Sequence, residues 1–151
     1  MRHSKAGDRS RWTGDDRERP LSAPGRAQAE ALVAAIGHTP TLLVSSPYRR
    51  CVETLEPLAE AHGLVVTTDG RLAEGGDFKP ALELLAEIPD GAVLCSHGDM
   101  IPMMIDALVR RGLELTNAVP GVKKGSWFAL ERDGASWTHA TWFPAPRRDA
   151  E

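Results

Sequence analysis

Two histidines and two arginines, at three places in the sequence, carry side chains suited to phosphoryl chemistry. Arg2 and His3 stand together at the start, Arg50 lies in a Ser-Pro segment over residues 46–54, and His97 follows a short apolar run. An unprotonated imidazole can attack phosphorus, and arginine presents a planar, permanently charged fork that fits phosphate oxygens. These residue types predict a pocket in which His3 receives a phosphoryl group while Arg2 and Arg50 clamp its oxygens.

The remaining chemical roles fall to residues near these motifs. Because cationic neighbours disfavour an imidazolium, the nearby arginines should keep His3 neutral at pH 7. We expect His97 to be cationic in the complex and to donate a hydrogen bond to a phosphoryl oxygen as charge builds up there. Glu74 is the candidate acid for the leaving group, and Ser4 and Lys5 are further candidate substrate-binding residues. The pattern implies no cofactor and no metal, because the other histidines lack partners at metal-ligand spacing.

Hydrophobic periodicity and capping signals divide the sequence into alternating helices and strands. Ser22 and Ser46 are suited to cap helices, and Pro57 should kink or split the second helix. The expected elements are helices over 24–36, 47–62, 80–87 and 99–111, strands over 41–44, 64–68 and 92–95, a hairpin of 127–131 with 137–143, and loops over 1–20, 69–76 and 113–125. This alternation predicts an α/β sandwich with a largely parallel sheet. Ligands in such folds bind beyond the carboxyl ends of strands, where Arg50 and His97 are expected.

Length and charge limit the classes of protein to which the chain can belong. Its 151 residues, 42% of them hydrophobic, fit one domain over 1–151 with a tail that frays from about residue 144. The net charge of -3 argues against a nucleic-acid partner. Residues 1–26, with seven lysines and arginines against four acids, suit a small anionic ligand, although charge alone favours a solvated charged loop. Two cysteines make no disulfide framework, and no signal peptide or long apolar stretch occurs, so we expect a cytoplasmic protein without a membrane partner.

The ordered motifs resemble those of the histidine phosphatase (phosphoglycerate-mutase-like) superfamily over nearly the whole chain. The matching residues are Arg2-His3-Ser4 (serine in place of the superfamily's glycine), Ser46, Pro47, Arg50 and Thr54 of a Ser-Pro-x-x-Arg-x-x-x-Thr pattern, Ser96-His97-Gly98, and Leu72 with Glu74. The resemblance implies a three-layer α/β/α sandwich and a phosphohistidine intermediate on His3. In the superfamily an apolar strand leads into the Arg-His pair at the centre of the sheet. We therefore expect that first strand to be missing here or to lie upstream of Met1.

A narrower resemblance points to SixA-like phosphohistidine phosphatases and to the C-terminal phosphatase domain of MutT-type Nudix fusion proteins. Its residues are Gly14-Asp15-Asp16, Arg19-Pro20-Leu21, the run from Gly25 to Leu32, and Lys124-Gly125-Ser126. In the fusions the phosphatase accompanies a nucleotide hydrolase, so the resemblance implies a Nudix domain upstream or in trans as a partner. Because this sequence contains no Nudix box, we expect only the phosphatase half here.

Three functions follow from these expectations. The first is a metal-independent phosphatase that works through phosphorylated His3 on a small phosphorylated substrate, a nucleotide or a phosphoprotein. The short span between Glu74 and His97 leaves little room for a lid, which favours a small, open pocket. The alternative is a non-catalytic phosphate-binding or interaction module derived from the same fold. A mutase is the third, and the chain is short for the insertions that would shield a phospho-enzyme from water.

Overall fold

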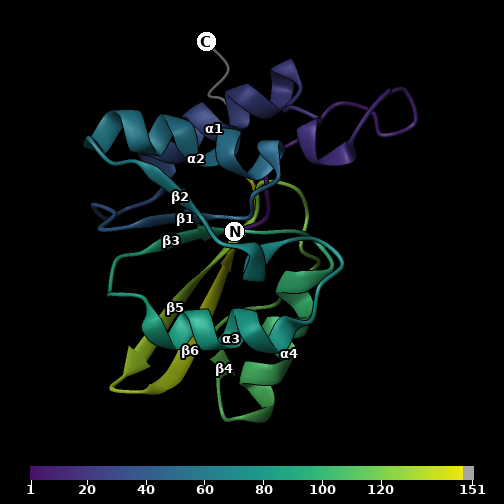
Figure 1. Cartoon of the computed structure of the whole chain (residues 1–151). Coiled ribbons are helices and arrows are strands. Elements are labelled where there is room, and N and C mark those ends of the chain that lie inside the picture. Colours follow the sequence, from purple (N-terminus) through teal and green to yellow (C-terminus); the bar gives the residue numbers. More distant parts are fainter. Residues whose placement is uncertain (148–151) are drawn as a thin grey trace.

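Helices cover both faces of a central sheet in the computed structural model, which describes residues 1–147 (Figure 1). α1 (Ala23–Ala35) and α2 (Arg49–His62) pack against each other on one face. α3 (Phe78–Glu87) and α4 (Met100–Arg110) lie on the other face. The three layers form the α/β sandwich that the alternating pattern predicts.

The central sheet brings the ends of its strands to one edge. β1 (Leu43–Ser45) lies between β2 (Val66–Thr68) and β3 (Val93–Cys95), and both pairings are parallel. Ser45, the last residue of β1, pairs with the last residues of β2 and β3, so all three strands end level. The segments that contain Arg50 and His97 leave the sheet from β1 and β3, at this same edge.

A second sheet contains the C-terminal hairpin. β5 (Trp127–Asp133) and β6 (Ser136–Phe143) pair antiparallel, which confirms the hairpin expected around Asp133-Gly134. β4 (Glu114–Leu115) pairs parallel to β6, so the expectation of loop throughout 113–125 was wrong at this point. Only two residues of β4 join the ladder, which is too short a run to give a periodic signal in the sequence.

The loop predictions also missed two short 3-10 helices. η1 (Asp16–Glu18) interrupts the N-terminal loop, and η2 (Gly70–Leu72) follows β2. Part of the tail predicted to fray, residues 148–151, lies outside the described residues. Within residues 1–147, no helix combines the length and the apolar composition that crossing a bilayer requires.

The capping predictions succeeded for α1 and failed for α2. Ser22 caps α1, because its hydroxyl oxygen accepts the Gly25 N–H at 3.1 Å. α2 begins two residues later than expected, and its N-cap, Tyr48, makes no side-chain cap bond. The Ser46 hydroxyl lies 2.8 Å from Nε2 of His97 and also accepts the Tyr48 N–H at 3.2 Å. Ser46 therefore joins the turn before α2 to a distant segment of the chain.

Pro57 lies inside α2 and does not split the helix, contrary to one of the two outcomes expected. A proline there removes one backbone donor. Burial offsets this loss, because Leu55 and Leu58 of the same helix are fully enclosed. Each buried leucine contributes about 1.5–3 kcal/mol relative to an exposed one. Tertiary packing thus outweighs the local effect of the proline.

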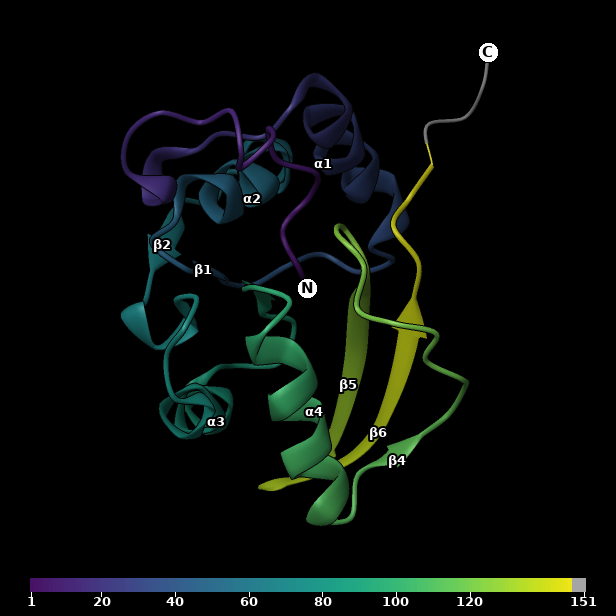
Figure 2. The same cartoon turned by 90° about the vertical axis from the view of Figure 1, so that its right-hand side faces the viewer.

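Residues 1–3 join the two sheets. The Ser96 N–H donates to the Met1 carbonyl at 2.9 Å, and the His3 N–H donates to the Ser96 carbonyl at 3.1 Å, which makes a single parallel bridge next to β3. On the opposite side, the Arg2 N–H donates to the Ser126 carbonyl at 3.0 Å, just before β5. Figure 2 shows the chain start between the parallel strands and β5. These residues occupy the position beside β3 at which the sequence motifs predict a first strand.

An apolar cavity of about 280 Å³ lies beside Met1. Ile36, Leu94, Met104 and Phe128 are among the residues that line it. The Met1 ammonium group donates to the Leu94 carbonyl at 2.7 Å, and burial lowers the pKa of this α-amino group below its ordinary value. A buried ammonium group is unfavourable by several kcal/mol unless it is well paired. Apolar residues placed in this cavity would bury further apolar surface.

Filling that cavity should stabilise the fold. We predict that a chain extended before Met1 by five apolar, β-branched residues melts about 5 °C or more above the unextended chain. The added strand would cover apolar surface, and an amide would replace the buried ammonium group. Calorimetry would measure the shift against a glycine-serine extension of equal length. Equal melting temperatures for the two extensions would contradict the prediction.

Candidate active site

His3 is held by backbone hydrogen bonds on both sides and is buried, with 5% of its surface exposed. Its carbonyl accepts the Gly125 N–H at 3.0 Å. The ring atom Nδ1 lies 2.8 Å from the Ser4 carbonyl oxygen. A carbonyl can only accept, so Nδ1 carries the proton and Nε2 keeps its lone pair. This tautomer leaves Nε2 available as a nucleophile.

Burial also keeps His3 uncharged. The pKa of the His3 imidazole falls to about 3, first because burial disfavours the charged ring, and then because His97, Arg50 and Arg2 repel a positive charge. The neutral state expected from the sequence is therefore confirmed. Its main cause differs, however, since desolvation exceeds the effect of the arginines.

His97 lies beside His3, with 5.5 Å between the ring centroids. Its Nε2 is 2.8 Å from the Ser46 hydroxyl and 3.6 Å from Sγ of Cys51, and its buried Nδ1 has no partner among residues 1–147. Burial and the Arg50 guanidinium lower the pKa of His97 to about 4. His97 is therefore neutral at pH 7 in the substrate-free protein, and the cationic form expected in the complex stays a prediction.

Arg50 is almost completely buried at the start of α2, with 1% exposed. Its Nη1 donates to the Asp16 carbonyl at 2.9 Å, and its Nη2 donates to Oε2 of Glu74 at 2.8 Å. The Asp16 carboxylate lies 3.2 Å from the same Nη2, and the guanidinium lies over the Tyr48 ring at 4.8 Å. Without substrate, two acids thus hold the arginine that the sequence assigns to phosphate.

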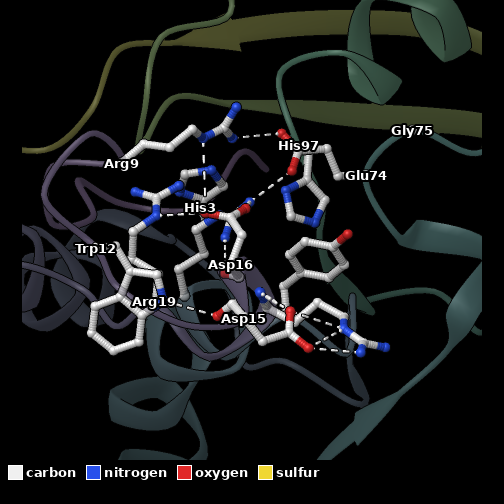
Figure 3. Close-up of polar contacts among 12 residues, drawn as sticks. His3, Arg9, Trp12, Asp15, Asp16, Arg19, Glu74, Gly75 and His97 are labelled. Carbon is white, nitrogen blue, oxygen red and sulfur yellow. Dashed lines mark hydrogen bonds and ion pairs between the residues drawn. The ribbon is translucent and has the colours of Figure 1, made fainter.

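Glu74, the candidate acid, is held by two guanidinium groups. Its Oε1 accepts from Arg9 at 3.0 Å (Figure 3). Its Oε2 accepts from Arg50 at 2.8 Å. A general acid must carry a proton on one of these oxygens. That arrangement requires Arg9 or Arg50 to move first, so proton donation by Glu74 stays a prediction.

A cluster of acids and bases that no sequence motif indicates surrounds Arg50. Asp16 accepts from Nε of Arg19 at 2.8 Å, and Arg19 is 3% exposed (Figure 3). Arg9 reaches both Asp16, at 3.8 Å, and Glu74. The positive charge of the N-terminal segment was the available signal. It could not indicate which of its charges fold inward, because Arg50 and Glu74 are distant in the sequence.

Arg2 lies against Gly98, which has no side chain. The Arg2 Nη1 donates to the Val122 carbonyl at 2.7 Å. A Cβ atom added at Gly98 would lie 2.6 Å from Cζ of Arg2, well inside van der Waals contact. The glycine of the Ser96-His97-Gly98 motif therefore makes room for the guanidinium group.

Ser4 and Lys5 differ in their placement. Ser4 is fully buried, and its N–H donates to Oγ1 of Thr54 at 3.0 Å while its own hydroxyl has no partner. Lys5 is exposed, and its backbone N–H donates to Oε1 of Gln28 at 2.9 Å. The structure thus brings Ser4 into the site and leaves Lys5 at the surface beside it.

Most of the unpartnered buried polar atoms in residues 1–147 belong to this site. Five such atoms occur, and four of them are Nε of Arg2, Oγ of Ser4, Nε of Arg50 and Nδ1 of His97. A buried polar atom without a partner is unfavourable by about 1–3 kcal/mol. An oxyanion beside His3 could complete these hydrogen bonds. The same part of the chain contains no cluster of three or more histidine, cysteine or acidic residues that could hold a metal.

Comparison with known proteins assigns the family. Residues 1–80 match the histidine phosphatase superfamily (branch 1), which is more than half of the chain. A protein of Mycolicibacterium smegmatis named 8-oxo-(d)GTP phosphatase is 37% identical over 153 residues, covering 97% of this chain and 47% of its own length. The chain thus spans about half the length of this curated relative. It belongs to the histidine phosphatase superfamily.

Solved structures support the same fold. The protein histidine phosphatase SixA complexed with tungstate superposes with a TM-score of 0.70 at 18% identity, covering 95% of this chain and 91% of that one. The putative phosphohistidine phosphatase SixA from Agrobacterium tumefaciens gives a TM-score of 0.71 at 19% identity, with 95% of each chain covered. The expected SixA-like fold is therefore confirmed.

Crowding Arg2 should weaken the site without unfolding the protein. We predict that Gly98→Ala lowers kcat/KM for p-nitrophenyl phosphate about tenfold or more, because the added methyl group must displace the Arg2 guanidinium. Gly37→Ala is the matched control, since its Cβ would meet no atom within 4 Å. Steady-state kinetics and melting curves would compare the two variants. Equal kinetics in both would contradict the placement of Arg2.

The two buried histidines should make the fold sensitive to acid. Their pKa values of about 3 and about 4 lie below the ordinary 6.5, so an unfolded chain binds protons there that the native protein does not. Full stability is present above about pH 6.5 and is lost as pH falls toward 4, by on the order of 3 kcal/mol for each histidine, with a further loss for His3 down to about pH 3. Denaturant titrations at several pH values would measure this. A His3→Gln/His97→Gln double variant should flatten the profile, and the exposed His62→Gln variant should not.

Proposed function

We propose that this chain is a phosphatase in which His3 is the nucleophile and becomes transiently phosphorylated. The observation that carries the proposal is the His3 ring itself. Its Nδ1 proton is engaged by the Ser4 carbonyl, its pKa is about 3, and unpartnered donors of Arg2 and Arg50 lie in the same site. A neutral imidazole with a free Nε2 beside fixed cations suits attack on a phosphoryl group.

The reaction has two displacements. In the first, the Nε2 lone pair forms a bond to phosphorus while the bond to the leaving oxygen breaks and that oxygen keeps the electron pair. In the second, water attacks the same phosphorus, the N–P bond breaks, and the lone pair returns to Nε2. Arg2, Arg50 and His97 would balance the charge on the phosphoryl oxygens through hydrogen bonds to charged groups. A proton from His97 or solvent would be needed wherever the leaving group is strongly basic.

The substrate classes open at this stage are a small phosphorylated molecule, a nucleotide or a phosphoprotein. The name of the Mycolicibacterium smegmatis relative favours a nucleotide, and the names of the SixA structures favour a protein phosphohistidine. Tungstate, an oxyanion bound in one of those structures, supports an anion site in this fold. The Nudix partner and the cytoplasmic location expected from the sequence stay predictions.

Loss of His3 should abolish turnover. We predict that His3→Ala lowers kcat for p-nitrophenyl phosphate by about a thousandfold or more, because the covalent step disappears. The wild type should keep its activity in a chelator and should trap an acid-labile phosphoryl group. His62→Ala is the control, since His62 is exposed at the end of α2. Full activity in His3→Ala would refute the proposal.

One observation favours a second function, a non-catalytic phosphate-binding module. Glu74 and Asp16 already occupy Nη2 of Arg50, so a phosphate that binds this nitrogen must compete with two carboxylates for it. If the two acids keep Arg50 from the transferred phosphoryl group, inorganic phosphate or vanadate would bind to the site, but no phosphoester would be hydrolysed. Titration calorimetry beside a panel of phosphoester assays distinguishes the two functions.

A further inference from the structure

The loop over residues 121–126 is fastened directly to the candidate nucleophile. The Gly125 N–H donates to the His3 carbonyl at 3.0 Å, and the Arg2 N–H donates to the Ser126 carbonyl at 3.0 Å. Gly125 has a φ of +83°, in the left-handed region that favours glycine, and an added Cβ would meet Ala145 at 3.1 Å. Lys124, the residue before this fixed turn, is therefore held beside His3 by the backbone.

Cations without a carboxylate partner gather at this point. Within residues 1–147, no ion pair is formed by Arg2, Lys5 or Lys124, whereas Arg9, Arg19 and Arg50 are paired with acids. Lys124 is exposed, and its pKa is lowered first by partial burial and then by repulsion from Arg2. Further repulsion comes from Arg19, Arg9 and Lys5. Like charges gathered in one place favour binding of an anion that neutralises them.

The state of the nearby acids points to a leaving group that needs no proton. Both oxygens of Glu74 are engaged by guanidinium groups, and Oδ2 of Asp99 accepts the Gly75 N–H at 2.7 Å. An alkoxide leaving group is strongly basic and requires a general acid. A phosphate leaving group is far less basic, since its last proton has a pKa of about 6. The site is therefore better suited to a phosphoanhydride than to an alkyl phosphate.

We propose that Lys124, together with Lys5, binds the second phosphate of a phosphoanhydride substrate such as a nucleoside diphosphate. This inference rests on the phosphatase function proposed above. His3 Nε2 attacks the terminal phosphorus, the bridging P–O bond breaks, and the bridging oxygen leaves as part of the nucleoside monophosphate with the electron pair. The two lysines hold that departing phosphate while Arg2 and Arg50 hold the transferred group.

The test compares an anhydride with an ester in the same enzyme. We would measure kcat/KM for ADP and for p-nitrophenyl phosphate in the wild type and in Lys124→Gln, Lys5→Gln and Lys79→Gln variants. The ratio of ADP to ester activity should fall about tenfold or more in the first two variants, because each loses a charge-assisted bond to the second phosphate. It should stay unchanged in Lys79→Gln, because Lys79 is exposed on α3. Lys124→Arg should restore much of the ratio.

Inorganic pyrophosphate and phosphate provide a second readout that does not need turnover of ADP. Pyrophosphate should inhibit the wild type more strongly than phosphate, and Lys124→Gln should remove that difference. An unchanged ratio in Lys124→Gln, or a wild-type preference for phosphohistidine over ADP, would overturn the second-phosphate site. His3→Ala separates the two proposals. If it abolishes turnover while the ratio does not respond to the lysines, only the substrate assignment fails.

Discussion

The site depends on one backbone arrangement, in which residues 1–3 are hydrogen-bonded between two sheets. Ser96 at the end of β3 binds this segment from one side, and the turn at Gly125 and Ser126 binds it from the other. Neither the end of β3 nor the start of β5 alone could hold the His3 imidazole between the two sheets. Because backbone hydrogen bonds position this segment, Nδ1 is the ring nitrogen of His3 that bonds to the surrounding fold, through the Ser4 carbonyl. Its other nitrogen remains available for chemistry.

The second constraint is electrostatic. Arg50 is buried, and an uncompensated buried charge is strongly unfavourable, so the substrate-free fold needs anions around it. Asp16 in η1 and Glu74 in the loop after η2 supply them. The same carboxylates compete with any phosphate that approaches. The contacts that stabilise buried Arg50 without a ligand therefore oppose the binding of phosphate to it. Arg9 can keep Glu74 paired when a phosphate replaces Glu74 at Arg50.

The sequence predicted the features that depend on local patterns. Ser22 caps its helix, and the hairpin turns at Gly134, because capping and turn chemistry involve neighbouring residues. The predictions failed where a distant contact decides the outcome. Ser46 looked like a helix cap but faces His97, which lies 51 residues away in the sequence. Ordered motifs placed His3 and His97 near each other, yet no local signal could show that Glu74 is held by Arg9 and Arg50.

The cations near His3 differ in whether a carboxylate neutralises them, and this difference bears on which anion the site can bind. Arg9, Arg19 and Arg50 are paired with carboxylates, although Nε of Arg50 has no partner within residues 1–147. Arg2 forms no ion pair with those residues, and Lys124 lies in the loop that the backbone fastens to His3. In the proposed complex, the transferred phosphate lies between Arg2 and the unpartnered Nε of Arg50, and the adjacent phosphate reaches Lys124. A single phosphate group would engage the two arginines and leave Lys124 without an anionic partner.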